Sequence, residues 1–188
     1  MLFRIRLYIK FLWYSKNEHG VHSPFVFNLL TDCFYIKKTN YPFDALLQFK
    51  KSELYAKKNK LLFRMVYYFK PKSTLIQGTT IDLEKNIMAQ ANPKGTIASE
   101  WNSELYDCIY FKLKNNPKIT KKDIEKWFLT TTNQSFWIFE NIYLNTTTKM
   151  LWDYIKESKR VSVTVDTYLF GLVFFRKEQK KENFVIRV

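Results

Sequence analysis

From Pro71 onward the chain alternates short apolar runs with amphipathic ones, and this alternation limits the possible folds more than any other feature. Strands are expected at 74–77, 96–100, 107–113 and 135–140, and helices at 80–91, 120–130 and 145–157. Two further strands, 161–167 and 169–176, enclose Gly171, and a short last strand is expected at 184–188. The pattern predicts an α/β fold with a mostly parallel sheet and an antiparallel hairpin at one edge.

The first 70 residues show helical patterns instead. Ser23 can cap a helix whose first position is Pro24, and Pro42 marks a further helix start. The apolar spacing then predicts helix through Phe69, with a break at 57–59 left open. We therefore expect a helical N-terminal extension over 1–70 and an α/β domain over 71–188, joined in one compact unit.

Composition places the chain among globular proteins. Of 188 residues 46% are hydrophobic and 18% aromatic, which argues against disorder. Cys33 and Cys108 have no metal-type spacing and lie among apolar neighbours, so packed, reduced thiols are expected. No apolar run reaches about 18 residues, so no transmembrane helix is expected. These features predict a cytoplasmic protein.

The N-terminal segment 2–14 is basic and aromatic. Arg4, Arg6 and Lys10 interrupt its apolar run and no small-residue cleavage site follows, so we interpret it as part of the mature protein and not as a signal peptide. It could lie on an anionic membrane surface or pack against the rest of the chain. Because no polar face is evident in the helical pattern, packing is the favoured alternative.

A formal net charge of +14 favours association with polyanions. The densest basic cluster comprises Lys112, Lys114, Lys118, Lys121, Lys122 and Lys126. Aromatic residues near it would suit a nucleic-acid-binding module, which combines phosphate contacts with base stacking. A solvated helix face is the commoner origin of such a cluster and is preferred.

Two motifs resemble a known family. The segment 17–27, NEHGVHSPFVF, is similar to the N-terminal signature of a bacterial family of class I S-adenosylmethionine-dependent methyltransferases, distantly related to the catechol O-methyltransferase type. The C-terminal VTVD and GLVFFRKE runs, at 163–166 and 171–178, resemble the closing hairpin of the same family. The resemblance implies a Rossmann-like methyltransferase sheet that binds S-adenosylmethionine.

The cofactor-binding positions of this family are altered. Against the family's E-x-G-x-S-x-G turn, Gly78 and Thr79 match, but Ile76 stands at the acid and Asp82 at the second glycine. A side chain in place of that glycine opposes close approach of the cofactor. Glu100 matches the acid that would bind the ribose hydroxyls. The resemblance thus implies Gly78, Thr79 and Glu100 as remaining cofactor-binding candidates, with Gly78 also explicable as a plain turn.

The metal-binding positions are altered too. The family's Asp-Gly-Asn-His motif is matched by Lys112 at the aspartate, and a lysine cannot ligate a hard cation. The later Asp-Asp-Ile-His motif is matched by Glu140 and Asn141 at the acids and by Tyr143 at the histidine. Glu140 and Asn141 are remnant candidates only, and no metal site is expected.

The sequence lacks one strand-helix unit of the family. Only residues 101–105 separate the strand ending at Glu100 from the next one, whereas a parallel crossover needs about a dozen residues. Residues 96–100 must therefore either form a hairpin with 107–113 or lie in the sheet with a taut link.

No catalytic residue is predicted. His19 and His22 are the chain's two histidines, lie three residues apart and are interpreted as part of a turn. We expect a methyltransferase-like protein that has lost catalysis (a pseudoenzyme) and binds S-adenosylmethionine weakly or not at all. The alternative is a basic polyanion-binding module on the same scaffold.

Overall fold

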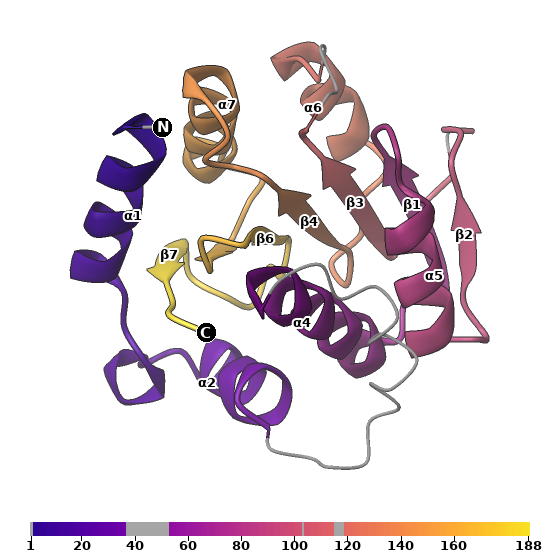
Figure 1. The fold of residues 1–188 in the computed structure, drawn as a ribbon. Helices are drawn as coiled ribbons and strands as arrows, with labels where there is room; N and C mark the ends of the chain where they lie inside the picture. Colours follow the sequence, from indigo (N-terminus) through magenta and orange to yellow (C-terminus); the bar gives the residue numbers. More distant parts are fainter. Residues whose placement is uncertain (1, 37–52, 103, 115–118) are drawn as a thin grey trace.

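The computed structural model describes residues 2–36, 53–102, 104–114 and 119–188, with the backbone alone at 53–55. Within these ranges one seven-stranded sheet has the order β2-β1-β3-β4-β6-β5-β7 (Figure 1). Its strands are β1 (Ser73–Gln77), β2 (Thr96–Ala98), β3 (Cys108–Lys112), β4 (Phe136–Glu140), β5 (Val163–Asp166), β6 (Phe170–Phe174) and β7 (Glu182–Val185).

The strand directions confirm the α/β fold expected from the sequence. Strands β2, β1, β3 and β4 are parallel neighbours, whereas β6 is antiparallel to both β4 and β5. The last strand, β7, pairs in parallel with β5 and begins two residues earlier than expected. The sheet is therefore mostly parallel, with the antiparallel β5–β6 hairpin near one edge and β7 as the edge strand.

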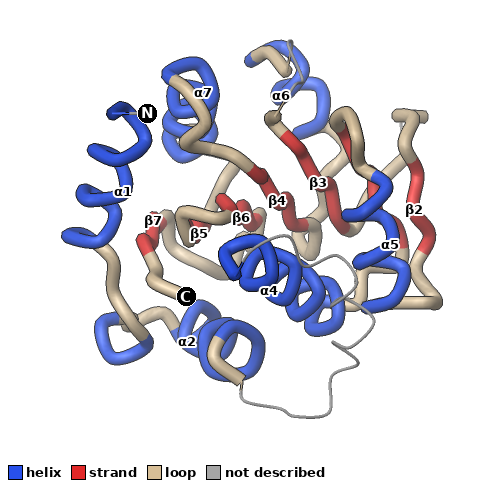
Figure 2. Tube along the Cα trace, viewed as in Figure 1, coloured by secondary structure: helices blue, strands red, loops and turns tan. Residues whose placement is uncertain are grey.

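Helices cover both faces of the sheet (Figures 1 and 2). One hydrophobic cluster joins α2 (Pro24–Leu29), η2 (Leu30–Phe34), α4 (Glu53–Phe69) and α5 (Asp82–Ala91) to one face. A second cluster joins α6 (Lys121–Phe128) and α7 (Thr146–Glu157) to the other. Alternate strand residues point to the two clusters, since successive side chains of a strand lie on opposite faces.

The N-terminal helices follow the expected signals in part. The Ser23 hydroxyl accepts a hydrogen bond from the Val26 amide and Pro24 occupies the first turn of α2, which confirms the predicted helix start. α4 continues through 57–59 without a break. The helix start expected at Pro42 lies outside the described residues.

The position of β2 resolves the alternatives for 96–100. β2 pairs in parallel with β1 and not with β3, so the hairpin alternative is wrong. Because β2 ends at Ala98 and β3 begins at Cys108, nine residues form the link, and these can span about 30 Å. No helix is present among the described residues of this link. Trp101 packs it instead against the α6–α7 side of the sheet.

The N-terminal helix α1 (Leu2–Tyr14) lies beside β7 at the left of Figure 1. A backbone bridge from Lys16 to Ile186 holds its C-terminal end next to the last strand. Phe11 is its buried side chain, so the favoured expectation that the aromatics of this segment pack inward is wrong for most of them. None of the described helices is both long and apolar enough to span a bilayer.

Both thiols are buried and free, as expected from their apolar neighbours. Burial raises the pKa of Cys33 and of Cys108 well above the ordinary range of a thiol. The thiolate forms are therefore suppressed, and neither residue is a candidate nucleophile.

Gly171 in β6 allows a close contact that a larger residue would break. A Cβ atom at this position would lie 2.7 Å from the ring of the buried Trp152. We expect Gly171→Ala to lower the free energy of unfolding by about 1–3 kcal/mol, the usual cost of overpacking. Urea denaturation would measure it. Gly20→Ala is the matched control, because its Cβ would meet the flexible Lys16 side chain. Equal stability of the two variants would contradict the contact.

Candidate cofactor site

The candidate site lies at the edge of the sheet where β1, β3 and β4 end. These three strands are parallel neighbours, so their C-terminal ends meet at the same edge. Open α/β sheets bind ligands outside this edge, in the crevice formed by the loops that follow the strands. The sequence places Gly78, Lys112 and Glu140 at or next to these three ends.

Backbone strain is concentrated in the loops at this edge. Thr80 follows β1 with φ 52°, Asn141 follows β4 with φ 68°, and Tyr168 lies between β5 and β6 with φ 63°. A left-handed conformation is tolerated by asparagine but is unusual for a β-branched residue such as threonine. Strain of this kind persists only where surrounding contacts hold it, and the contacts at Thr80 come from Lys112.

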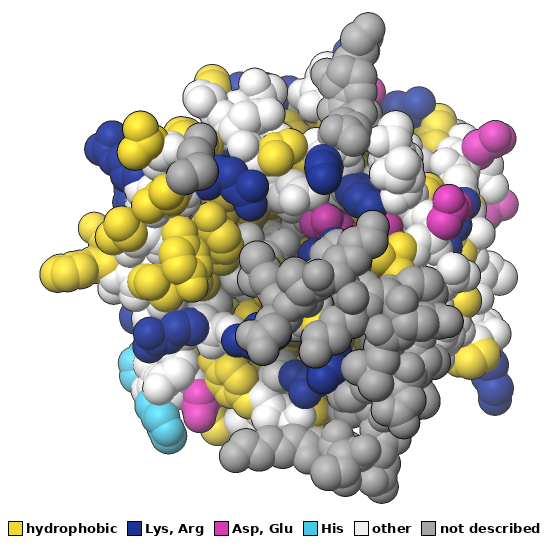
Figure 3. Space-filling model, in the orientation of Figure 1, with side chains coloured by type: hydrophobic (Ala, Val, Ile, Leu, Met, Phe, Trp, Pro, Cys, Tyr) yellow, Lys and Arg dark blue, Asp and Glu magenta, His cyan; other side chains and the backbone are white. Residues whose placement is uncertain are grey.

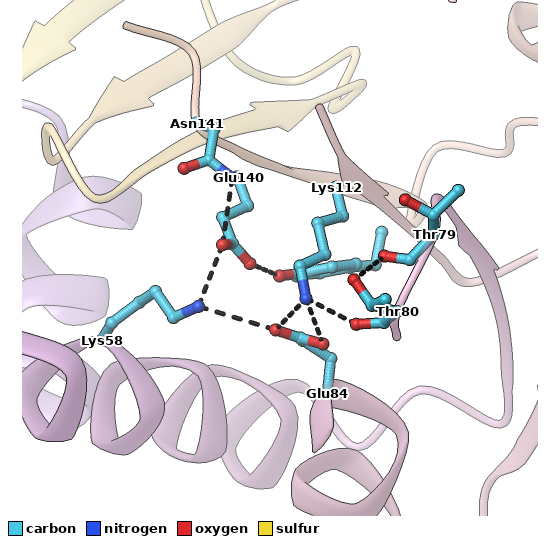
Figure 4. A network of polar contacts seen from close by, with 8 residues as sticks. Lys58, Thr79, Thr80, Glu84, Lys112, Glu140 and Asn141 are labelled. Atoms are coloured by element: carbon cyan, nitrogen blue, oxygen red, sulfur yellow. Dashed lines mark hydrogen bonds and ion pairs between the residues drawn. The ribbon is translucent and has the colours of Figure 1, made fainter. Parts of the chain in front are cut away.

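Lys112 is the last residue of β3, and its side chain is largely buried. Its Nζ donates to the Thr80 carbonyl oxygen at 2.7 Å and lies 2.9 Å from each carboxylate oxygen of Glu84 (Figure 4). Glu84 belongs to α5 and its side chain is fully buried. The Lys112 ammonium therefore joins the loop after β1 to the helix that follows it.

A second lysine extends this contact into a network. Lys58 of α4 places its Nζ 3.6 Å from Glu84 and 2.9 Å from Glu140. Glu140 ends β4, accepts a short hydrogen bond from the Tyr110 hydroxyl, and accepts one from the Asn141 amide at 3.1 Å. Figure 4 shows these side chains converging from two helices and two strands. We call this set, Lys58, Glu84, Tyr110, Lys112, Glu140 and Asn141, the Lys–Glu network.

The periodicity of each element explains why the network forms. In β3 and β4, alternate residues place Tyr110 and Lys112, and also Glu140, on the face covered by α4 and α5. Lys112 and Glu140 are direct neighbours in the register of these strands. Glu84 lies on the buried stripe of α5 together with Ile87 and Met88, at helical spacing.

Sequence reasoning missed Lys58 and Glu84, although each carries a recognisable signal. Glu84 lies three and four residues before apolar residues of the buried stripe, and Lys58 lies four residues before the buried Leu62. A charged residue on the apolar stripe of a helix indicates a buried ion pair, since an unpaired buried charge is very costly. The position alone does not identify the partner, because that depends on the tertiary fold.

Gly78 is required by the close approach of Lys112. Its φ is 142°, and a Cβ atom there would lie 2.8 Å from the Lys112 Cβ and 2.9 Å from the Lys112 carbonyl oxygen. Both its conformation and the contact exclude other residues. The plain-turn interpretation thus accounts for this glycine, and Lys112 covers the side of the turn that faces β3.

Of the other predicted cofactor-binding residues, Thr79 borders this network, because its carbonyl oxygen accepts a hydrogen bond from the Thr80 hydroxyl (Figure 4). Glu100 follows β2, which pairs with the other side of β1. Thr79 and Glu100 are exposed. Asp82, which stands where the family has its second glycine, is exposed at the start of α5. A carboxylate there is stabilised by the positive end of the helix dipole, so the residue has a structural explanation.

The residues present do not fit a divalent metal ion. Glu140 and Asn141 offer oxygen atoms, but the Glu140 carboxylate is already bound by Lys58 and Tyr110. Lys112 adds a positive charge where a third oxygen ligand would be needed. No group of three potential His, Cys, Asp or Glu ligands occurs within the described ranges. His19 and His22 are both exposed in or beside the 3-10 turn η1 (Glu18–Gly20), in line with their interpretation as turn residues.

The basic cluster on which the polyanion-binding alternative rests is smaller than the sequence suggests. Lys112 was wrongly included, because it is buried in the Lys–Glu network. Lys118 lies outside the described residues. Lys114, Lys121, Lys122 and Lys126 are exposed. Of these, Lys121 lies over the Tyr154 ring and Lys126 over the Trp101 ring, at 4.7 and 3.6 Å from the ring centroids.

Tyr143, which replaces the family's second histidine, belongs to a different contact. Its hydroxyl donates a short hydrogen bond to Asp166, and its ring stacks on Tyr168 with centroids 5.2 Å apart. Burial raises the pKa of Asp166, and burial together with the Asp166 carboxylate raises the pKa of Tyr143. The pair borders a cavity of about 620 Å³ between α1, α7 and β7, away from Gly78.

Comparison with solved structures identifies proteins of similar fold. A protein assigned as a caffeoyl-CoA O-methyltransferase from Staphylococcus aureus superposes with a TM-score of 0.52 and 12% identity, over 73% of this chain and 93% of that one. The O-methyltransferase TomG from Streptomyces achromogenes, involved in tomaymycin synthesis and solved with S-adenosylmethionine, gives 0.45 and 13%, over 64% and 80%. No protein-family model matches the chain, and no curated protein matches it. At this identity the first likeness establishes a methyltransferase-like α/β fold.

Removal of the Lys112 charge tests the Lys–Glu network. We expect Lys112→Met to lower the free energy of unfolding by about 3 kcal/mol or more, because the buried Glu84 carboxylate loses its two closest contacts. Lys114→Met is the control and should change stability by less than about 0.5 kcal/mol, since Lys114 is exposed. Chemical denaturation measures both.

The double variant Lys112→Met/Glu84→Gln separates the ion pair from general loss of packing. It removes both charges, so it should be more stable than the sum of the two single changes predicts, by about 1–3 kcal/mol. Strict additivity of the two single effects would contradict an energetic coupling between Lys112 and Glu84.

Proposed function

We propose that the chain is a catalytically degenerate relative of the bacterial class I S-adenosylmethionine-dependent O-methyltransferases of the catechol O-methyltransferase type. The fold and its order of elements support this relationship, and the motifs at 17–27, 163–166 and 171–178 agree with it. In this proposal the Lys–Glu network occupies the place of cofactor and metal binding, so the protein does not transfer methyl groups.

The main observation in support of this proposal is the position of the Lys112 ammonium. It is held between the loop after β1 and α5, by the Thr80 carbonyl oxygen and the Glu84 carboxylate. Both ammonium groups of the network are paired with the Glu84 and Glu140 carboxylates. The carboxylates are therefore already neutralised by lysines of the chain and are not free to attract a cationic ligand such as the sulfonium group of S-adenosylmethionine.

Loss of acceptor groups supports the same conclusion. Ile76 is fully buried in β1, where the related enzymes have an acid that accepts hydrogen bonds from the cofactor. The oxygen-rich metal site that would activate an acceptor hydroxyl is reduced to Glu140 and Asn141, and Glu140 is paired with Lys58. The Lys58 ammonium thus makes the contact with Glu140 that a bound metal ion would make in the related enzymes.

Three residues remain from the proposed ancestral cofactor site. Gly78 and Thr79 would border the methionine part of S-adenosylmethionine, and the exposed Glu100 would accept hydrogen bonds from its ribose. Weak binding through these residues is the most that we expect. No catalytic residue is proposed.

The alternative, a basic polyanion-binding module, rests on the +14 charge and on Lys114, Lys121, Lys122 and Lys126. Two of these lysines already stack on aromatic rings, and acidic residues alternate with them along α6. The geometry therefore favours it less. Fluorescence polarisation with a single-stranded oligonucleotide at low salt would show binding that falls steeply with salt if this alternative held.

Calorimetric titration with S-adenosylmethionine tests the proposed function. We expect no saturable heat at ligand concentrations up to about 100 μM, which corresponds to a binding free energy weaker than about −5.5 kcal/mol. TomG in the same buffer is the positive control. A micromolar dissociation constant for this chain, abolished by Glu100→Gln and retained in the exposed control variant Glu104→Gln, would overturn the proposal.

A further inference from the structure

The outward face of α1 is an apolar surface without a partner in the described structure. We propose that α1 lies in the plane of an anionic membrane surface and attaches the protein to it peripherally. This inference does not depend on the proposed function, because it uses only α1 and its surroundings.

Exposed apolar side chains are concentrated on this helix. Of the fifteen large hydrophobic residues that are exposed among the described ones, eight belong to α1. Five of them form one stripe: Leu2, Ile5, Ile9, Leu12 and Trp13 are 84, 45, 61, 38 and 83% exposed. At 3.6 residues per turn these positions fall within an arc of about 100°. That width is typical of a face that is buried in an apolar environment.

The opposite face of α1 already has its contacts within the chain. Phe11 is buried, and the rings of Tyr8 and Phe11 pack on Tyr168 with centroids 4.8 and 5.4 Å apart. The Tyr168 hydroxyl donates to the carbonyl oxygen of Arg4. These contacts fix the rotation of the helix and turn Leu2, Ile9 and Trp13 away from the body of the protein. Ile5 and Leu12, at the edge of the stripe, also line an open groove of about 890 Å³ beside Tyr168 and Val188.

Charge identifies the kind of surface that the stripe would meet. The helix contains Arg4, Arg6 and Lys10 and no acidic residue. On a helical wheel with about 100° per residue the stripe covers about 120–220°. Arg6 and Lys10 lie beside one edge of it, at about 240° and 280°. Figure 3 shows the apolar patch over α1, on the left, with basic side chains beside it. An apolar stripe with basic residues along one side suits a surface of anionic lipid headgroups.

The dimensions and the tryptophan agree with binding in the plane of the membrane. Thirteen helical residues span about 20 Å, too short to cross the hydrocarbon core of a bilayer. Trp13 is exposed near the end of the stripe, and tryptophan is enriched at the membrane–water interface.

A second copy of the chain is a poorer occupant of this face. Pairing two α1 helices through their stripes would bring their Arg6 and Lys10 side chains together, and each chain carries a formal charge of +14. Like charges across an interface oppose association. An anionic membrane has the opposite charge and accommodates the apolar stripe as well.

Vesicle co-sedimentation tests the proposal with the full chain. We expect binding to vesicles of phosphatidylcholine with about 30% phosphatidylglycerol, and at least tenfold weaker binding to phosphatidylcholine alone. Arg6→Gln/Lys10→Gln should weaken binding to the anionic vesicles at least tenfold, because each basic residue near the surface contributes roughly a fivefold factor. Ile9→Glu/Trp13→Glu should abolish it. Leu129 is an exposed apolar residue at the end of α6, so Leu129→Glu is the matched control. This variant should bind the anionic vesicles as well as the unaltered chain does.

Circular dichroism and unfolding midpoints equal to those of the unaltered chain would show that each variant is folded, as expected for exposed positions. Binding that survives Ile9→Glu/Trp13→Glu, or that Leu129→Glu weakens equally, would overturn the proposal. So would a failure to bind anionic vesicles, whether the chain is then monomeric or forms a dimer through α1 in sedimentation velocity.

Discussion

The side chain of Glu84 in α5 is fully buried. The rest of the site is arranged so that lysine side chains neutralise the charge of its carboxylate. An isolated charge at this depth would be strongly destabilising, so the Lys112 ammonium at 2.9 Å from both oxygens contributes strongly to the stability of the fold. Since Lys112 ends β3, this contact fixes the distance between the central strands and α5. The same ammonium holds the Thr80 carbonyl, and with it the strained turn after β1.

The pairing of Glu84 with Lys112 also affects the edge of the sheet at which related folds bind their ligands. The turn at Gly78 is kept, but the backbone and Cβ of Lys112 on the neighbouring strand lie so close that no side chain fits at this position. Glu140 is likewise kept at the end of β4, but its carboxylate is bound by Lys58 and Tyr110. The scaffold is thus retained by contacts among its own charged residues. In our proposal these contacts stand where an enzyme would hold a cofactor and a metal ion.

Much of the fold could be predicted because it depends on local patterns. The alternation after Pro71, the capped helix at Ser23 and the closing hairpin around Gly171 all follow from spacing and turn chemistry. The position of β2 could not be predicted, since strand order depends on long-range pairing. The site was predicted in part: Lys112 was recognised as a substitution, but its burial was missed. Its partners Lys58 and Glu84 come from separate helices, and only the tertiary structure brings them together.

In our proposal the Lys–Glu network, and not a ligand, occupies the edge of the sheet next to Gly78. A crystal structure of the protein grown with millimolar S-adenosylmethionine tests this most directly. We predict that Lys112 Nζ remains within hydrogen-bonding distance of Glu84 and of the Thr80 carbonyl, with no cofactor density next to Gly78. Density for S-adenosylmethionine against the Gly78 turn, with the Lys112 side chain displaced from Glu84, would contradict the account.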